Sequence, residues 1–467
     1  MQPKLSLTEG SITRALLAFS LPILAGNVLQ SLNGSVNSIW VGKYLGAPAF
    51  AAAGNANVIM FLLFAVIFGL SMAATITVGQ CIGAKNVAEA KRVVGTSAVF
   101  FLGVSLSLSV LGVVATPALL AALSTPADAL APALAYMRII FLALPFTGGL
   151  FFIMAVLRGA GDSRTPFRYL ALSVVLDIAL NPLFIFGFGP VPRLGIAGSA
   201  LATFIAQGIS FFALLLHLFR TRHFLYIHSD ELRLFRVDWR IVRVLVSKGV
   251  PMGLQLFVVS SSMVLLTKLV NRFGSEETAA FNAAIQLWNY VQMPALAIAA
   301  AVSSMAAQNV GAGRWDRVGR VALTGVAFNL LSGGTLILLI YAFNRGALGL
   351  FLPSESAAIQ IAVHLNLIVL WSFALFGISI VLFGVVRATG AVIPPLLMLM
   401  ISLWGIRVTF AYLMVDRWHD DAIWWSFPLS SLASLLMSTS YYRLGGWRRA
   451  KLGLRPVSPA AMTDPGG

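Results

Sequence analysis

The chain has 467 residues, of which 59% are hydrophobic and only 10% are charged, and its mean hydropathy is +0.89. This composition is typical of a membrane protein and excludes a soluble globular protein. The net charge of +16 would indicate nucleic-acid binding in a soluble protein, and the single cysteine, Cys81, excludes an internal disulfide.

A helix that crosses a bilayer needs about 20 mainly apolar residues, and twelve segments of the chain meet this requirement. Their approximate limits, in chain order, are 15–41, 50–79, 93–116, 131–156, 166–188, 196–219, 241–270, 279–305, 318–342, 359–385, 394–415 and 424–442. The sequence therefore predicts an all-α membrane protein. Residues 1–14 lack a short apolar region with a small-residue cleavage site, so we expect no removable signal peptide.

Basic residues are distributed unevenly about these spans. The N-terminus, the C-terminal tail, and the loops after spans two, four, six, eight and ten together with the adjoining span ends hold 24 of the 32 lysines and arginines. Cytoplasmic loops carry such an excess, so we expect both termini to be cytoplasmic, in a multi-pass protein of the cytoplasmic (inner) membrane. The net charge is then a signal of topology, and we expect no nucleic-acid partner.

The fifth span contains an acidic residue, Asp177, near its middle, and Asn181 lies one helical turn later on the same face. No other acidic residue lies well inside a predicted span. A charged side chain at the bilayer centre costs about 2.5–3.5 kcal/mol on insertion scales, so such residues usually face a cavity and move ions or protons. A structural hydrogen bond between helices is the alternative.

The sequence repeats itself on either side of the charged linker 220–243. At a nearly constant offset, Pro22 recurs as Pro251, Gly46 as Gly274, Gln80 as Gln308, Gly83 as Gly311, Arg158 as Arg387, Gly161 as Gly390 and Pro166 as Pro395. Each unit holds six spans, an even number, so the two units share one orientation and are related by a pseudo-twofold axis along the membrane normal. We expect an N-lobe, residues 1–228, and a C-lobe, residues 229–467, that face each other across a central cavity.

Four repeated fragments are predicted to be structural. GQCIGAKN (79–86) and AQNVGAGR (307–314) end spans two and eight, where glycine suits a helix C-cap and the next basic residue complements the helix dipole. LRGAGDSRTP (157–166) and VRATGAVIPP (386–395) are typical of tight turns whose prolines begin the next helix.

Taken in order, these motifs resemble those of the multidrug and toxic compound extrusion (MATE) family. The resemblance rests on the two six-span repeats, GQ-x-x-GA after span two, QN-x-GAG after span eight, the RGAGD turn, and SIWVGKYLG at 38–46. It implies two helical bundles that form a V. It also implies the export of organic cations and other amphipathic compounds, driven by entry of H⁺ or Na⁺.

Spans seven, eight and ten contain no Asp or Glu, so the chain resembles the DinF-like branch, whose coupling site lies in the N-lobe. That branch uses an Asp on span one, an Asn and an Asp one turn apart on span five, and a Thr on span six. The matching positions here are Asn37, the reversed pair Asp177 and Asn181, and Thr203, for which Ser199 is a competing alignment. The resemblance implies a proton or Na⁺ site at these residues, with Na⁺ held by Asp177 and Asn181.

We expect ionised Asp177 to bind a cationic substrate in a water-accessible hollow of the N-lobe, and entering H⁺ or Na⁺ to displace it by alternating access. Gln30, Asn33 and Asn55 are weaker substrate-binding candidates, because polar packing explains each equally well.

Four other polar residues fall in or near the spans. Arg138 and Lys268 lie towards span ends, where long side chains snorkel to the interface. His364 is more simply explained by polar packing, and Arg407 lies deep in span eleven without a partner that the sequence identifies.

Two other functions remain to be weighed. A lipid-linked oligosaccharide flippase shares the two-lobe architecture, but such proteins commonly line their cavity with basic residues, whereas this N-lobe offers an acid. An intramembrane enzyme is not supported, because the chain has no HExxH motif, no paired intramembrane acids and no Ser/His pair within spans. We expect a monomer in the lipid bilayer, without a cofactor other than the coupling ion.

Overall fold

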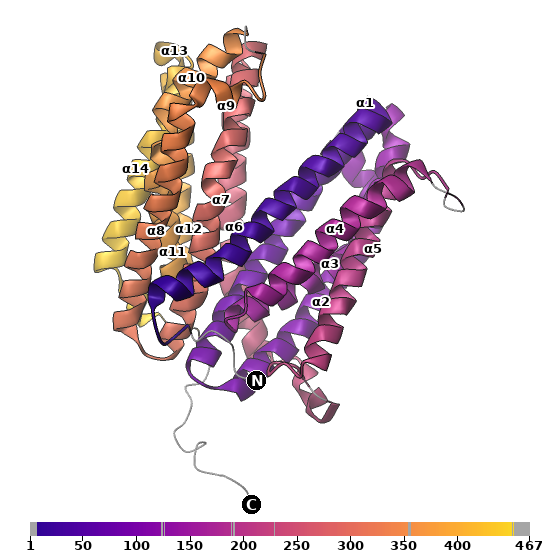
Figure 1. The fold of residues 1–467 in the computed structure, drawn as a ribbon, viewed down its shortest axis with the longest axis vertical. Coiled ribbons are helices and arrows are strands. Elements are labelled where there is room, and N and C mark those ends of the chain that lie inside the picture. Colours follow the sequence, from indigo (N-terminus) through magenta and orange to yellow (C-terminus); the bar gives the residue numbers. More distant parts are fainter. Residues whose placement is uncertain are drawn as a thin grey trace, which may run out of the picture.

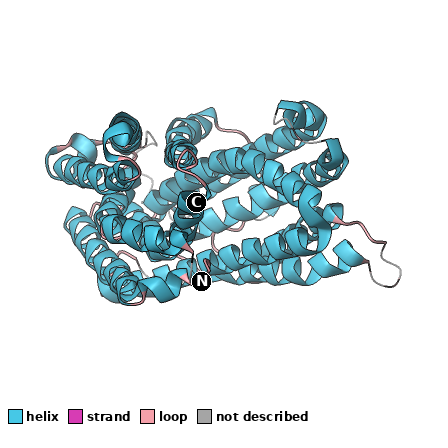
Figure 2. Ribbon diagram, turned by 90° about the horizontal axis from the view of Figure 1, so that it is seen from above, coloured by secondary structure: helices cyan, strands magenta, loops and turns pink. Residues whose placement is uncertain are grey.

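The computed structural model describes residues 7–122, 125, 127–187, 189, 192–227, 229–353, 356–450 and 452, and within these the chain is helical and contains no strand. Two bundles of helices diverge from a shared base like the arms of a V (Figure 1) and lie side by side when viewed from above (Figure 2). The first bundle consists of α1 (Ile12–Gly83), α2 (Val87–Ala122), α3 (Ala127–Gly159), α4 (Arg164–Phe186) and α5 (Ile196–Arg220).

A linker with the short helix η1 (Ser229–Phe235) leads into the second bundle. That bundle consists of α6 (Trp239–Val270), α7 (Ser275–Gly311), α8 (Trp315–Ala342), α9 (Asn344–Leu348), α10 (Ala357–Val369), α11 (Ser372–Ala388), α12 (Ile393–Leu399), the π-helix η2 (Met400–Val408), α13 (Thr409–Trp418), α14 (Asp421–Leu444) and η3 (Gly446–Arg449). We call the end of the molecule where α1 begins and α14 ends the basal end.

Within the described residues, ten helical segments are long and apolar enough to cross a membrane, and α10 with α11 forms an eleventh span that is bent by 48°. The last predicted span, 424–442, forms α14, which is 24 residues long but does not reach the same apolarity. Its lower apolarity follows from its serines, several of which are buried against neighbouring helices. The predicted all-α membrane architecture is confirmed.

Helix α1 contains the first two predicted spans, which meet at Gly46, where φ is +81°. Only glycine adopts such a conformation readily. At its basal end, α1 packs on the second bundle, and the Arg317 guanidinium of α8 donates to the Glu9 and Gly10 carbonyls at 2.9 Å. The segment around Glu9 and Gly10 therefore packs against the C-lobe, and the division at residues 228 and 229 remains an expectation.

The two lobes meet at the basal end through reciprocal contacts. Gln80 donates its side-chain amide to the Ala388 carbonyl at 2.7 Å, and its repeat partner Gln308 donates to the Gly159 carbonyl at 2.8 Å. A Cβ atom at Gly83 would overlap the Gln308 backbone, and one at Gly311 would overlap the Gln80 backbone. Approximate twofold symmetry therefore relates the two halves of this contact.

This finding corrects the predicted role of two glycines. Gly83 and Gly311 are the last helical residues, and the left-handed conformations that follow belong to Lys85 and Gly313. The glycines are required because two backbones approach closely. By contrast, the predicted turns after spans four and ten are present, with φ of +93° at both Gly161 and Gly390.

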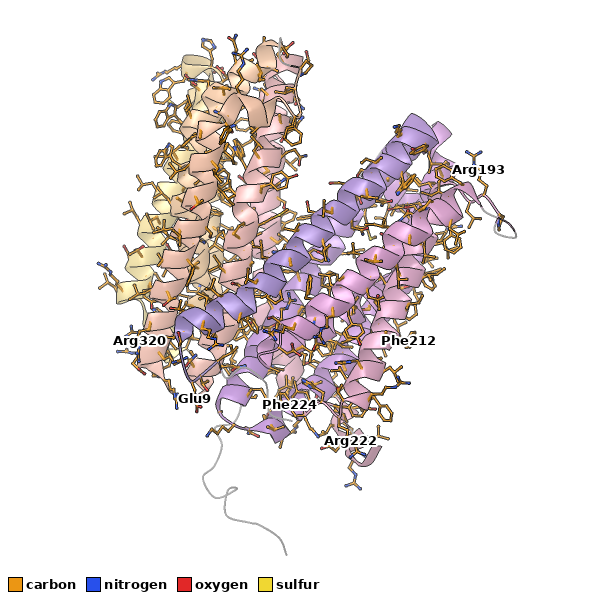
Figure 3. All side chains as sticks on the ribbon, in the orientation of Figure 1. Glu9, Arg193, Phe212, Arg222, Phe224 and Arg320 are labelled. Carbon is orange, nitrogen blue, oxygen red and sulfur yellow. The ribbon has the colours of Figure 1, made fainter. Side chains whose placement is uncertain are left out.

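Charged side chains gather at the two ends of the molecule. Figure 3 places Glu9, Arg222 and Arg320 at the basal end and Arg193 at the opposite end. Arg138 and Lys268 are exposed, as expected for side chains that snorkel, and His364 pairs with Asp421 at 2.9 Å in an exposed position.

Candidate functional site

Asp177 lies near the middle of α4, where α1 and α5 pack against that helix. Its neighbours in sequence are apolar, so α4 is an ordinary membrane-length helix whose one acid faces the other helices instead of lipid. The residue is only 4% exposed. A carboxylate at such a depth is stable only with partners that replace water.

Two side chains from different helices donate to this carboxylate. Asn33 of α1 donates its amide to Oδ2 at 2.9 Å, and the Thr203 hydroxyl of α5 donates to Oδ1 at 2.9 Å. Each oxygen therefore has one donor. Hydrogen bonds to a charged group contribute about 1.5–3 kcal/mol each, so this arrangement offsets much of the cost of burying an ionised acid.

A second polar layer lies one helical turn further along α1. The Ser199 hydroxyl of α5 donates to Asn37 Oδ1 at 2.7 Å, and the buried Tyr136 of α3 lies beside the same Asn37 side chain. Asn37 thus contacts α3 and α5 but not the carboxylate itself. In the sequence, Thr203 and Ser199 are alternative matches to the same family position. In the structure they have different partners, because Thr203 donates to Asp177 and Ser199 donates to Asn37.

Asn181 lies one helical turn beyond the acid on α4. Its amide nitrogen donates to the Asp177 backbone carbonyl at 2.8 Å, while its Oδ1 is buried without a partner. Asn33 Oδ1 is buried and unpaired in the same way. Orphaned amide oxygens beside a carboxylate are the hard oxygen ligands that an alkali cation takes. The residues present therefore fit either a proton on Asp177 or a Na⁺ ion.

The structure distinguishes among the three weaker substrate-binding candidates. Asn33 is a direct partner of Asp177, whereas Gln30 is exposed and makes no hydrogen bond among the described side chains. The side chain of Asn55 lies outside the described residues. Tyr136 was not predicted, although a tyrosine within the apolar fourth span is a polar signal that the sequence contains.

The sequence predicts a water-accessible hollow around Asp177, but in this conformation the residue is almost completely buried. With 4% of the residue exposed, α1, α4 and α5 nearly enclose the carboxyl group. Its partners Asn33 and Thr203 are only half-buried, so the carboxyl group is hydrogen-bonded to side chains that themselves reach the surface. An exchange of ions or substrate at Asp177 therefore requires α1 to move relative to α4 and α5.

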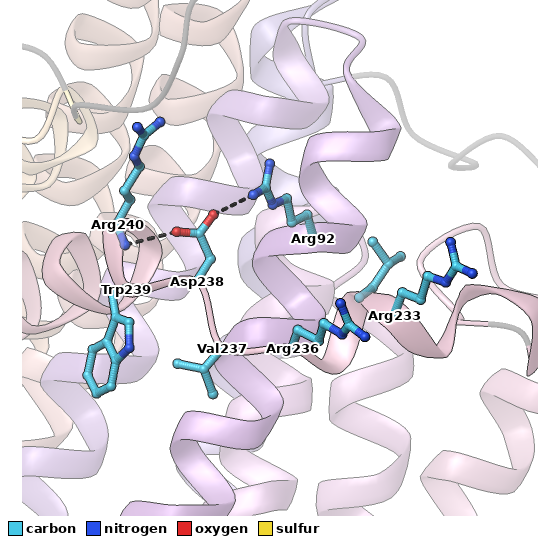
Figure 4. Close-up of a pocket in the computed structure, with 8 residues that line it drawn as sticks. Arg92, Arg233, Arg236, Val237, Asp238, Trp239 and Arg240 are labelled. Carbon is cyan, nitrogen blue, oxygen red and sulfur yellow. Dashed lines mark hydrogen bonds and ion pairs between the residues drawn. The ribbon is translucent and has the colours of Figure 1, made fainter.

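A hollow of about 720 Å³ lies at the linker, between η1 and the starts of α2 and α6. Its lining includes Arg92, Arg233, Arg236 and Arg240 (Figure 4). Arg92 pairs with Asp238 at 2.7 Å. A second, open hollow of about 550 Å³ lies at the turn between α6 and α7. Both lie at span ends, so neither contributes to the site around Asp177.

Comparison with known proteins identifies relatives that cover 95% of the chain. The family model described as MatE matches twice, at residues 22–183 and 251–413. The chain is 36% identical over 447 residues to the probable multidrug resistance protein YoeA of Bacillus subtilis, covering 95% of this chain and 96% of that relative. It is 32% identical to the probable multidrug resistance protein YpnP of the same organism, covering 95% and 98%.

Solved structures resemble the fold at lower identity. An outward-facing conformation of a multidrug resistance MATE family transporter of the MOP superfamily superposes with a TM-score of 0.88 at 20% identity, covering 95% of this chain and 98% of that one. The two family matches in this chain begin at Pro22 and Pro251, which are the first pair of repeated residues.

Proposed function

This chain belongs to the MatE family of multidrug transporters, and from that premise we propose that it exports amphipathic cations in exchange for an ion bound at Asp177. One observation carries the proposal: a carboxylate near the middle of a span is held by donors from two other helices. Removing any guest from this acid changes contacts on α1, α4 and α5 together. A single site can therefore couple ion binding to helix movement.

The proposed cycle follows from competition for one negative charge. Ionised Asp177 attracts a cationic substrate, with Asn33 and Thr203 as fixed donors. A proton or Na⁺ that enters from outside neutralises the acid and displaces the substrate outwards. The membrane potential supplies about 2.3 kcal/mol per charge per 100 mV, and each pH unit adds about 1.4 kcal/mol. One ion can therefore sustain a substrate gradient of roughly a hundredfold or more.

We favour H⁺ as the coupling ion, because a proton needs only Asp177. The site has one carboxylate, since Asn37 takes the position where the DinF-like branch has an Asp. Na⁺ would also need the unpaired oxygens of Asn33 and Asn181, which lie on two helices. We assign the chain to the DinF-like branch because its one acid within a span, Asp177, lies in the N-lobe.

We further propose that the chain acts as a monomer in the cytoplasmic membrane, with both termini inside. The excess of basic residues in the termini and in the loops after the even-numbered spans supports this orientation. With the basal end at the cytoplasm, the V of Figure 1 opens outwards.

Efflux of the cationic dye rhodamine 123 from vesicles, under H⁺ and Na⁺ gradients imposed separately, tests the proposal. We expect efflux with the H⁺ gradient alone and none with the Na⁺ gradient alone. Efflux with only the Na⁺ gradient would assign the site to Na⁺. Absence of efflux under both gradients would contradict the proposed exchange.

A further inference from the structure

The hollow at the linker between the lobes concentrates positive charge that the proposed exchange does not use. Its lining includes four arginines and one acid, Asp238. All four arginines are exposed, and among the side chains that the structure describes only Arg92 has an acidic partner. By contrast, the lining of the hollow at the turn between α6 and α7 consists of asparagine, glycine, serine, threonine and alanine.

The acids close to the linker hollow are already paired. Asp238 accepts from the Arg240 backbone N–H at 2.9 Å at the start of α6, and its other oxygen pairs with Arg92 at 2.7 Å. Glu231 of η1 pairs with Lys91 of α2 at 2.6 Å. Neither acid therefore compensates the other three guanidinium groups of the lining.

The linker is fixed against α2, so the hollow is a defined part of the fold. The Thr96 hydroxyl of α2 donates to the Arg236 carbonyl at 3.2 Å. A Cβ atom at Gly95, on the same helix, would overlap the Leu234 carbonyl, so the backbones of the linker and α2 are in direct contact. The arginines of the linker therefore extend from a backbone that is held in place.

Apolar side chains remain exposed beside these arginines. Trp239 is 77% exposed and Leu232 is 60% exposed, and Phe235 and Val237 are exposed as well. In Figure 4 the Trp239 ring points away from the guanidinium groups of the four arginines. Surfaces with an apolar and a basic side lie at the boundary between lipid headgroups and acyl chains, where tryptophan is enriched. A free anion in water would gain nothing from the apolar side.

The chemistry of the basic side matches a phosphate group. Guanidinium groups bind phosphate oxygens through paired, parallel N–H groups. Basic loops on the cytoplasmic side are common in membrane proteins and predict only a diffuse attraction to anionic lipids. Here the charge gathers in one hollow of about 720 Å³ whose backbone is fixed, which favours a single bound headgroup.

We propose that this hollow binds the phosphate group of an anionic phospholipid of the cytoplasmic leaflet. Arg233, Arg236 and Arg240 surround the phosphate, and Trp239 lies at the boundary with the acyl chains. Because the lining comes from α2, the linker and the start of α6, the bound lipid contacts both lobes where they are joined. This inference goes beyond export and uses only the orientation that we propose for the chain.

Native mass spectrometry of the purified full chain tests the inference. Titration with phosphatidylglycerol and with phosphatidylcholine of the same acyl chains measures the affinity for the first bound lipid. We expect the unaltered protein to prefer phosphatidylglycerol at least tenfold. Each basic residue near an anionic surface strengthens binding about fivefold, so the triple variant Arg233→Gln/Arg236→Gln/Arg240→Gln should lower this preference at least fivefold.

A matched control removes the same charge from exposed arginines outside the hollow, at the end of α5, the end of α14 and in η3. This control is the triple variant Arg220→Gln/Arg443→Gln/Arg449→Gln. It should lower the preference less than twofold. Equal losses in the two triple variants would show a diffuse attraction and overturn the inference, as would an unaltered protein that does not prefer phosphatidylglycerol.

Two further measurements keep the test decisive. Inorganic phosphate in excess over the lipid should leave phosphatidylglycerol bound to the unaltered protein, and displacement would assign the hollow to free phosphate instead of a lipid. Should the triple variant not fold, Arg233→Gln/Arg236→Gln leaves α6 unchanged and should lower the preference at least threefold; an unchanged preference would overturn the inference. The assay measures binding without transport, so a failure of rhodamine 123 efflux contradicts the proposed function alone.

Discussion

The two lobes share a helix plan but differ in the charge at their centres. The N-lobe holds Asp177 between donors from α1 and α5, and the C-lobe holds Arg407 between a hydroxyl and an aromatic ring of α14. At the basal end, by contrast, Gln80 and Gln308 make matching hydrogen bonds to the opposite lobe. The repeat therefore retains the residues that join the lobes and differs in the charge that is buried inside each lobe.

This difference separates two parts of the repeat. The basal contacts are symmetric, because each lobe presents the same surface to the other. The charges buried inside the lobes are opposite, so the shared helix plan accommodates unlike residues at its centre.

The largest expected effect concerns the symmetric contact. Gly83→Val and Gly311→Val each place a side chain against the backbone of the other lobe. We expect each to reduce rhodamine 123 efflux more than tenfold, and by similar factors, because backbone atoms cannot move aside. Gly103→Val is the control, since no atom lies within 4 Å of its Cβ position. Normal efflux in either variant, or a loss in only one, would contradict the prediction that the two halves of the contact are equivalent.

The second prediction concerns the effect of the C-lobe charge on stability. Arg407→Met replaces an arginine without an acidic partner by an apolar side chain of similar length. Because burying an uncompensated charge is costly, we expect the free energy of unfolding to rise by about 1–3 kcal/mol. Thermal unfolding of the purified protein measures the change. A lower melting temperature would show that Arg407 stabilises the C-lobe and would contradict this prediction.

The third prediction concerns the donors around the acid. Thr203→Val removes the hydroxyl that donates to Asp177 and keeps the shape of the side chain. A lost hydrogen bond to a charged group is equivalent to about one to two pH units, so the pH of half-maximal efflux should rise by about this amount. Ser210→Ala, on the same helix and without a partner in the structure, should leave the profile unchanged. An unaltered profile for Thr203→Val would mean that the hydroxyl does not act on the coupling acid.

The smallest expected effect lies outside the charge sites, in the linker between the lobes. Burial lowers the pKa of His223, and repulsion from His217 adds to this effect while Asp162 opposes it. The unfolded chain therefore binds a proton at a higher pH than the folded protein, so stability falls as the pH drops below about 6.5. His223→Gln should flatten this decline, with a change of about 1–2 °C in melting temperature at pH 5.5. An identical pH dependence in both proteins would contradict the assignment.

Much of this organisation follows from the sequence. The membrane class, the repeat and the importance of Asp177 depend on composition, spacing and the cost of one buried charge, all of which are local properties. The direct role of Asn33, the contact of Tyr136 with Asn37 and the backbone packing of Gly83 depend on which helix faces touch. Apolar spans lack a strong amphipathic pattern, so the sequence does not determine how each helix is rotated. The repeat offset of 229 that Pro166 and Pro395 keep aligns Asp177 with Ile406, next to Arg407, and the π-helix in that segment is not predicted by the sequence pattern.

The central claim is that one carboxylate in the N-lobe couples transport to the ion gradient. Accumulation of rhodamine 123 by vesicles with combined H⁺ and Na⁺ gradients, compared between the unaltered protein and Asp177→Asn, tests it most directly. We predict that Asp177→Asn inserts and melts normally but accumulates no dye beyond equilibrium. Accumulation equal to that of the unaltered protein would contradict the account.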